Sequence, residues 1–202
     1  MRKLIYGIIT LALLTTAGFA AFDDYIPDAV ASSMGDAPPP IGFGPHSLFG
    51  GKGISAGGGY RRAFNYADFD EIGAWVSFAD EKYGRAMLEV SSFGVENLTS
   101  ETKFGLAYSK PLFSDIHTEL GLGVKANIFS LSYEPSISGT ELGSSMGFSL
   151  DFGAEAVVYE RTRIRILAEN LTATNMGVEG DVELPRAVTG ALSYSPYNNT
   201  NM

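Results

Sequence analysis

The chain has 202 residues, no cysteine, two histidines and 24 glycines, and its 14 basic residues stand against 23 acidic ones. The absence of cysteine excludes a disulfide scaffold, a thiolate metal site and a lipoprotein anchor, and the net charge of −9 argues against a general nucleic-acid binder. Hydrophobic residues make up 45% of the chain but charged residues only 18%, as is expected where some apolar side chains face lipid.

The first 20 residues have the pattern of an export signal peptide. Arg2 and Lys3 form a basic start, residues 4–17 are apolar but too few for a comfortable transmembrane helix, and the small residues Gly18 and Ala20 suit cleavage after Ala20. The alternative is an uncleaved anchor helix. We predict a signal peptide over residues 1–20 and an exported mature protein.

Residues 21–53 show no clear periodicity. They contain the run Pro38-Pro39-Pro40 and, after it, a series of glycines. This composition predicts an irregular N-terminal segment, either a mobile lead-in or a plug inside a barrel.

From residue 54 onward, apolar residues alternate with polar residues or glycine, which is the pattern of strands whose two faces meet different environments. The clearest stretch is Thr118–Ile128, which is long enough to cross a bilayer as a tilted strand of about 9–11 residues. No helical periodicity of comparable quality occurs. The predicted strands are Ile54–Phe64, Ile72–Ala79, Gly84–Phe93, Lys103–Lys110, Thr118–Ile128, Met146–Val158, Thr162–Glu169 and Ala187–Tyr194.

The apolar phase of the fifth strand changes near its end. Beyond Ile128, the apolar residues are Phe129, Leu131 and Tyr133 instead of those at even positions. Such a change predicts either a β-bulge or the emergence of the strand end from the membrane.

The connections between these strands differ in length. Those near Asp80–Tyr83, Pro111–Ile116 and Tyr159–Arg161 are short, and those near Gly94–Thr102, Glu134–Ser145 and Leu171–Arg186 are predicted to be longer. Short turns that alternate with long loops are typical of outer-membrane barrels, as are aromatic residues near both strand ends. The predicted aromatic bands are Tyr83, Tyr108, Phe113, Tyr159 and Tyr194 at the turns, and Phe64, Tyr66, Phe93, Phe104, Phe129 and Tyr133 at the loops.

We therefore predict an all-β fold, an antiparallel up-and-down transmembrane β-barrel over residues 54–202 with about eight strands. A soluble secreted β-sandwich, which also alternates, is the alternative.

Charged residues within the predicted strands occur mostly on the face opposite the apolar one. On the lipid face a basic residue would cost about 2–4 kcal/mol at the bilayer midplane, so these residues are expected to face the interior. Across the turn at Tyr159–Arg161, Glu155 is expected to lie near Arg165. The alternative to a transport role is that these charges fill the interior as salt bridges. The predicted lumen-lining residues are Lys103, Glu119, Lys125, Asp151, Glu155, Arg163, Arg165 and Glu169, on the same face as Glu89.

No group of residues has the spacing of a catalytic or metal site. His46 and His117 are too few for a metal site, and Asp115 and His117 do not stand in a distinctive spacing with any serine. The glycine pattern of residues 51–56 matches a loose dinucleotide motif but is followed by no predicted helix. We predict neither an enzyme nor a cofactor.

Several short motifs occur within residues 54–196. They are Lys103-Phe104-Gly105-Leu106-Ala107-Tyr108, Leu120-Gly121-Leu122-Gly123-Val124-Lys125, Gly147-Phe148-Ser149-Leu150-Asp151-Phe152-Gly153, Ala168-Glu169-Asn170-Leu171-Thr172, Leu184-Pro185-Arg186 and Gly190-Ala191-Leu192-Ser193-Tyr194-Ser195-Pro196. In these segments the chain resembles the bacterial outer-membrane family of long-chain fatty acid transporters (FadL-like) and its PorV-like relatives. The resemblance implies a barrel with more strands than this chain holds and an N-terminal plug.

The leading hypothesis is thus an outer-membrane barrel that acts in the passage of small or hydrophobic molecules or in protein export. Its expected partners are outer-membrane lipid, together with a hydrophobic small molecule or proteins of an export machinery. The alternative is a non-conducting barrel that serves as a membrane anchor or surface-binding scaffold. Because Gly57-Gly58-Gly59 interrupt the first strand and a polar tail follows the last, we expect a fragment or part of a larger assembly, with an autonomous eight-stranded barrel as the alternative.

Overall fold

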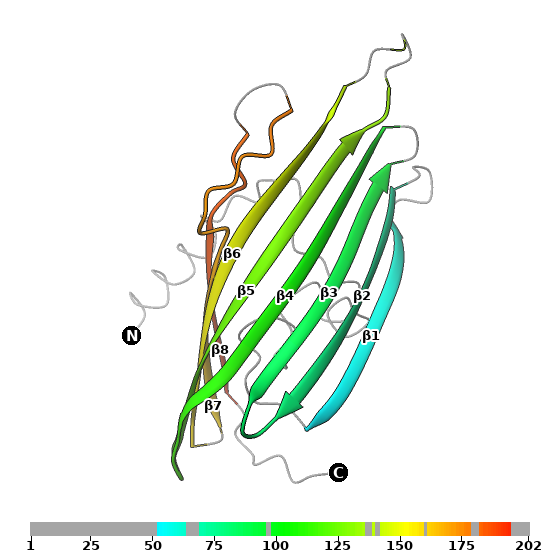
Figure 1. The fold of residues 1–202 in the computed structure, drawn as a ribbon. Helices are drawn as coiled ribbons and strands as arrows, with labels where there is room; N and C mark the ends of the chain where they lie inside the picture. The colour runs from blue at the N-terminus through cyan, green and yellow to red at the C-terminus, as the bar shows by residue number, and fades with distance from the viewer. Residues whose placement is uncertain are drawn as a thin grey trace, which may run out of the picture.

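The computed structural model describes residues 52–63, 69–95, 98–135, 139, 142–159, 161–178 and 182–194. The predicted signal peptide and nearly all of segment 21–53 lie outside these residues. The described chain forms one sheet of eight strands in sequence order, with each neighbouring pair antiparallel (Figure 1). The predicted all-β, up-and-down fold is confirmed. The strands are β1 Gly53–Ala63, β2 Phe69–Asp80, β3 Gly84–Val95, β4 Thr99–Ser114, β5 Thr118–Tyr133, β6 Ser144–Val158, β7 Thr162–Glu169 and β8 Ala187–Tyr194.

The alternation of side chains located all eight strands, but it underestimated the length of the central strands β4 and β5. β4 covers Thr99–Ser114 instead of Lys103–Lys110, so the longer loop predicted over Gly94–Thr102 is wrong. Val95 pairs with Thr99, and the amide of Leu98 donates to the carbonyl of Val95 at 3.0 Å, so only three residues separate the two strands. The serines and threonines there suggest a loop by composition, yet threonine is β-branched and suits strands well.

The β-bulge lies on β4 instead of at the phase change in β5. The ladder between β4 and β5 shifts between Pro111 and Phe113, while both ladders of β5 run without interruption past Phe129. Proline has no amide hydrogen to donate to a ladder, so a bulge is one of the few places in a sheet where it is tolerated. A bulge at Phe129 is therefore excluded.

The two ends of the sheet carry different connections. We call the end with the connections β2–β3, β4–β5 and β6–β7 the turn end, and the opposite end the loop end. At the turn end, Asp80 Oδ1 accepts hydrogen bonds from the amides of Lys82 and Tyr83 at 2.8 and 3.0 Å, which fixes the β2–β3 turn. Among the described residues, β1 pairs only with β2 and β8 only with β7, so the sheet has two edges.

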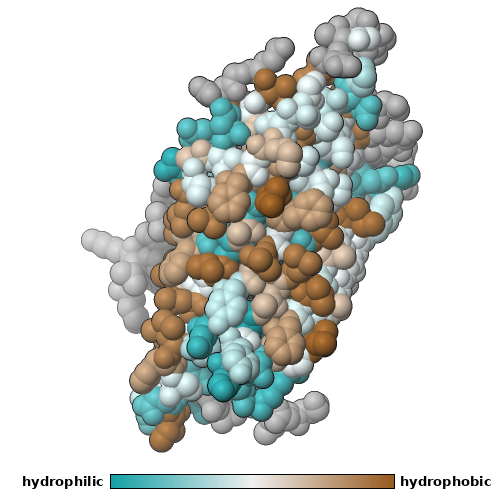
Figure 2. Space-filling view, in the orientation of Figure 1, coloured by the Kyte–Doolittle hydropathy of each residue, from teal (hydrophilic) through white to brown (hydrophobic). Residues whose placement is uncertain are grey.

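The sheet is curved, with β7 and β8 curling behind β6, and its two faces differ in composition (Figure 1). On the convex face, called the outer face, large apolar side chains are exposed over the middle of the strands (Figure 2). On the concave inner face lie most of the buried residues, which include ten polar or charged ones. The part of the chain that the structure describes contains no helix long and apolar enough to cross a membrane.

The bulge can be tested by cross-linking, because the chain has no native cysteine. Phe113 pairs with Leu120 only if one residue of β4 is bulged out, so the double variant Phe113→Cys with Leu120→Cys is expected to form a disulfide under mild oxidation. The control Leu112→Cys with Leu120→Cys should remain largely reduced, as measured by mass spectrometry. Preferential cross-linking of the control pair would show an unbulged ladder.

Candidate functional site: a charged inner face closed by a loop

All eight charged residues predicted to line an interior lie on the inner face. The register places them there, because each is aligned across the ladders with positions that face away from the exposed apolar residues. Lys103, Lys125, Asp151, Glu155 and Arg165 are buried, and Glu119, Arg163 and Glu169 are half-buried. These residues therefore share one face of the sheet, and the lining of a lumen by them stays a prediction.

The first group of ion pairs centres on Glu155. Glu155 is 1% exposed, and its Oε1 lies 3.1 Å from Nη2 of Arg165 and 3.2 Å from Nε of Arg163. Glu155 and Arg165 are direct cross-strand partners on β6 and β7, as expected from the short turn between them. Tyr159 adopts a left-handed φ of 53° in that turn. The predicted proximity of Glu155 and Arg165 is confirmed, and Arg163 joins them from the diagonal position.

The second ion pair crosses an intervening strand. Lys125 Nζ on β5 lies 2.5 Å from Glu89 Oε1 on β3, and both side chains are at least nine-tenths buried. Between them on β4 is Gly105, where an added Cβ would lie 2.7 Å from Cγ of Glu89. The carboxylate of Glu89 thus occupies the space that a side chain at position 105 would fill. The sequence analysis considered only residues on neighbouring strands, so it did not predict this pair between β3 and β5. Gly105 was the available signal, because a glycine on an inner-face position leaves space for a side chain from the next strand.

The third group connects the inner face to the β7–β8 connection. Asp151 Oδ2 accepts a hydrogen bond from the side-chain amide of Asn127 at 2.6 Å, and its Oδ1 accepts one from the backbone amide of Asn170 at 2.9 Å. Asn170 has a left-handed φ of 54°, which asparagine tolerates better than most residues. Its side-chain amide donates to the carbonyl of Pro185 at 2.9 Å. Asp151 therefore anchors the start of the connection between β7 and β8, and Asn170 joins that start to its end at Pro185.

The described residues of this connection, 170–178 and 182–186, are called the inner loop. Its first part runs along the portion of β6 that β7 does not cover. The β6–β7 ladder ends at the pair Phe152–Ala168, and beyond it the amide of Leu171 donates to the carbonyl of Leu150 at 2.9 Å. The hydroxyl groups of Thr172 and Thr174 both donate to the carbonyl of Phe148. Backbone groups of β6 that would otherwise be open are thereby satisfied by the loop.

The inner loop also forms the principal apolar cluster of the inner face. Met176 and Leu184 of the loop pack with Phe129 and Leu131 of β5, and all four are no more than 4% exposed. Gly147 on β6 leaves the space in which the side chains of Met176 and Thr174 lie. Phe129 therefore belongs to an interior cluster, and the prediction that it forms part of an aromatic girdle is wrong.

The phase change in β5 thus has a structural cause. Once the inner loop covers the inner face, Phe129 and Leu131 are packed there, while the outer positions Ser130 and Ser132 are polar. Lys103 lies at the border between the two regions, with Nζ 5.8 Å from the centre of the Phe129 ring. The inner face therefore carries buried charged residues along the strands and its principal apolar cluster beneath the loop.

The described residues are not arranged as a metal site. They contain no group of three or more histidine or acidic side chains placed to hold a metal ion. His117 lies in the β4–β5 turn with its ring 5.0 Å from that of Tyr159, and His46 lies outside the residues that the structure describes.

Comparison with known proteins found no match: no family model, no curated protein and no solved structure shows significant similarity to the chain.

Loss of the charge on Glu155 should be costly. The variant Glu155→Gln keeps the shape of the side chain but leaves two arginines without their carboxylate, which is expected to lower the free energy of unfolding by about 3 kcal/mol. The control is Glu183→Gln, whose partner Arg186 lies 4.0 Å away in an exposed pair and which should change stability by less than about 1 kcal/mol. Denaturant titration in detergent measures both, and equal effects would contradict the importance of the buried cluster.

Proposed function

We propose that this chain is an outer-membrane β-barrel protein whose interior is filled, and that it serves as a membrane anchor or surface-binding scaffold. The observation that carries the proposal is the distribution of polarity between the two faces. Phe104, Ile128 and Phe148 are 48–50% exposed in one cross-strand row on the outer face, while Glu155, Lys125 and Asp151 are buried on the inner face.

A soluble β-sandwich would have the opposite arrangement. Its apolar face would be packed against a second sheet and its charged face would meet water. Here the charged residues are buried and paired, and the apolar residues are exposed. Lipid is the environment in which such an arrangement is stable, because it receives apolar side chains and excludes charged ones.

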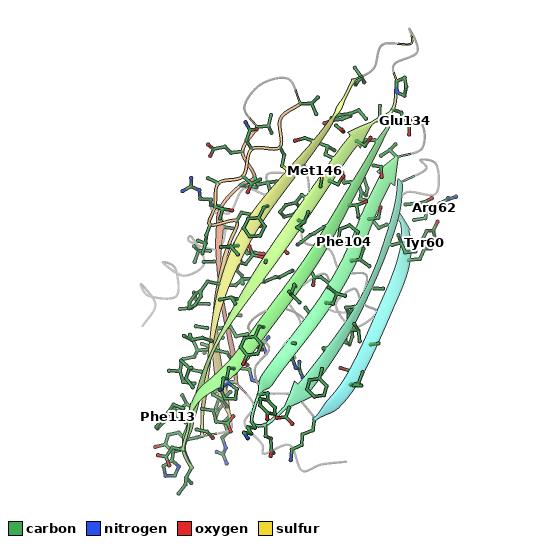
Figure 3. All side chains as sticks on the ribbon, in the orientation of Figure 1. Tyr60, Arg62, Phe104, Phe113, Glu134 and Met146 are labelled. Atoms are coloured by element: carbon green, nitrogen blue, oxygen red, sulfur yellow. The ribbon has the colours of Figure 1, made fainter. Side chains whose placement is uncertain are left out.

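The height of the apolar belt fits a bilayer. Along β5 the outer residues from Leu120 to Ile128 are apolar, a span of about 27 Å at roughly 3.4 Å per residue, which a tilt of about 40° reduces to about 21 Å. This compares with an apolar band of about 25 Å in known barrels. Figure 3 shows Phe104 near the middle of β4 and Phe113 at its turn end.

Aromatic residues lie below the belt at the turn end, where an interfacial girdle would be needed. The hydroxyl of Tyr108 donates to the carbonyl of Tyr83 at 2.6 Å, so these two residues are held together. The exposed aromatic residues at this end include Phe78, Tyr83, Tyr108, Phe113, Tyr159 and Tyr194.

The filled interior favours the non-conducting role. The ion pairs of Glu155 and of Lys125 have little contact with water, and the inner loop covers the loop end of the inner face. An ion path along this face would require these groups to separate.

A second candidate function is the passage of small or hydrophobic molecules, or a role in protein export, as in the FadL-like and PorV-like family that the sequence resembles. One observation favours it. The inner loop covers an apolar surface formed by Phe129 and Leu131, so a displacement of the loop would open an apolar site inside the barrel.

The outer face should respond to charge according to depth. In protein refolded into phospholipid vesicles, Val124→Arg is expected to lower the free energy of unfolding by about 2–4 kcal/mol, because Val124 is exposed midway between Leu120 and Ile128, the ends of the belt on β5. The control Thr102→Arg, on the same face but at the loop end, should cost only about 0–1 kcal/mol. Equal costs at the two positions would contradict a lipid-facing belt.

Conductance separates the two candidate functions. In planar bilayers the protein is expected to give no discrete conductance steps, because buried ion pairs and the inner loop close the inner face. Steps whose ion selectivity changes in Lys125→Glu or Glu155→Lys would instead support the transport function.

A further inference from the structure

The described sheet has two long free edges, on β1 and β8, which lie at the two ends of the curved sheet in Figure 1. Free strand edges are usually protected by lysine, proline or a bulge, because unpaired backbone groups invite pairing with another strand. These two edges carry no such protection. Residues 53–60 of β1 and 187–194 of β8 contain no charged residue and no proline, and both strands pair with their neighbours without a register shift.

A shorter free edge, on β4, is protected. Beyond the last pair between β3 and β4, Arg85 with Ser109, the described part of β4 has no strand on its β3 side. This extension contains Lys110, Pro111 and the bulge before Phe113. A lysine, a proline and a bulge thus occur together on the short edge. Their absence from β1 and β8 indicates that these two edges are suited to pairing.

The apolar belt drifts across the sheet relative to the ladder. The exposed apolar residues run from Ile72 to Phe78 on β2 and from Val188 to Tyr194 on β8, so the middle of the belt is at positions 75 and 191. Phe78 lies on the turn-end side of this middle and Val188 on its loop-end side. The ladders nevertheless align Phe78 with Val188, through Ala86, Tyr108, Val124, Phe152 and Ala168.

This drift specifies how the two edges would meet. It amounts to three residues on β2 and three on β8 over the six steps between these strands, or one residue per strand. With about 3.4 Å per residue and about 4.8 Å between strands, the strands are tilted by about 35°, which is typical of barrels. One further step brings the belt of β8 beside that of β1, which extends from Ile54 to Tyr60. With outer residues opposite outer residues, Tyr194 then lies beside Ala56 and Leu192 beside Gly58.

Two observations favour a second copy of the chain as the source of the partner strand. The interior of an eight-stranded barrel is just wide enough for side chains, whereas here the inner loop also lies on the inner face, with Met176 packed on Phe129. In addition, Glu155 and Lys125 are buried within one sheet that has two free edges. Their burial therefore does not require β1 to meet β8 of the same chain.

A two-fold axis along the barrel would satisfy both edges at once. Rotation about this axis keeps the two copies in the same orientation in the membrane. Because β1 and β8 run in opposite directions, β8 of each copy can form an antiparallel pair with β1 of the other. Two eight-stranded sheets together give 16 strands, which is an even number within the range of known outer-membrane barrels.

We propose that two copies of the chain form one barrel, in which β8 of each copy pairs with β1 of the other and Tyr194 lies beside Ala56. This inference rests on the proposed membrane location, because the belt sets the level at which the edges meet. It names the partner of the chain in that membrane. Each copy brings an inner face that is covered by its own side chains and inner loop, so the proposed non-conducting role is unchanged.

The test mixes two single-cysteine variants of the full chain, Ala56→Cys and Tyr194→Cys, before they are refolded together into phospholipid vesicles. Because the chain has no native cysteine, a disulfide between these positions in the mixture must join two chains. Mild oxidation of the mixture is expected to give a linked species of twice the mass of one chain on non-reducing gels. Neither variant alone should give it. The register control is a mixture of Ala56→Cys with Val188→Cys, which should remain unlinked.

A double variant that carries Ala56→Cys and Tyr194→Cys in one chain separates the outcomes. If it forms a disulfide within one chain while the mixture stays unlinked, the chain closes on itself and the two-copy proposal is overturned. The proposal is also overturned if inserted protein gives no linked species, or if the control mixture links as readily as the test mixture. These outcomes leave the proposed membrane location standing. A protein that does not insert into the vesicles contradicts that location as well.

Discussion

One continuous hydrogen-bonded ladder from β1 to β8 determines which environment each side chain meets. Because side chains alternate between the faces of a strand, a slip of one residue in any register would exchange the two faces of that strand. Such a slip in β6 would bring Asp151 and Glu155 to the outer face and Leu150 to the inner one. The charged residues and the apolar belt therefore specify the same register. A slip of one residue would expose charged side chains on the apolar face and bury apolar ones among the charges.

We expect the inner ion pairs to contribute more to the choice of register than to net stability. The cost of removing charges from water offsets much of their attraction, whereas the loss of one partner leaves an uncompensated buried charge. Glycines make the arrangement possible at two places. Gly105 allows Glu89 to reach Lys125 across a strand, and Gly147 allows the inner loop to pack against β6. A small side chain at either position would displace the groups that close the inner face.

The two edges of the sheet are the part of the structure that a membrane would tolerate least. In lipid, the outer backbone groups of β1 and β8 would have no water to bind, so each edge would need a partner strand. With eight antiparallel strands in sequence order, β1 and β8 run in opposite directions, as strands that close a barrel do. The sequence predicts that β1 and β8 pair with strands of a larger assembly, and the alternative is that they pair with each other.

The sequence by itself determined the number of strands, their approximate positions and the assignment of residues to two faces, because period-2 alternation is a local property of each strand. It also located Glu155 beside Arg165, since a short turn fixes the register of the two strands it joins. The bulge after Pro111, the short β3–β4 connection, the pair Glu89–Lys125 and the packing of Met176 against Phe129 were decided only by the tertiary structure. The first two depend on how neighbouring strands pair, which the alternation of side chains does not specify. The last two join groups across an intervening strand or from a loop, and no local pattern records which distant residues share one space.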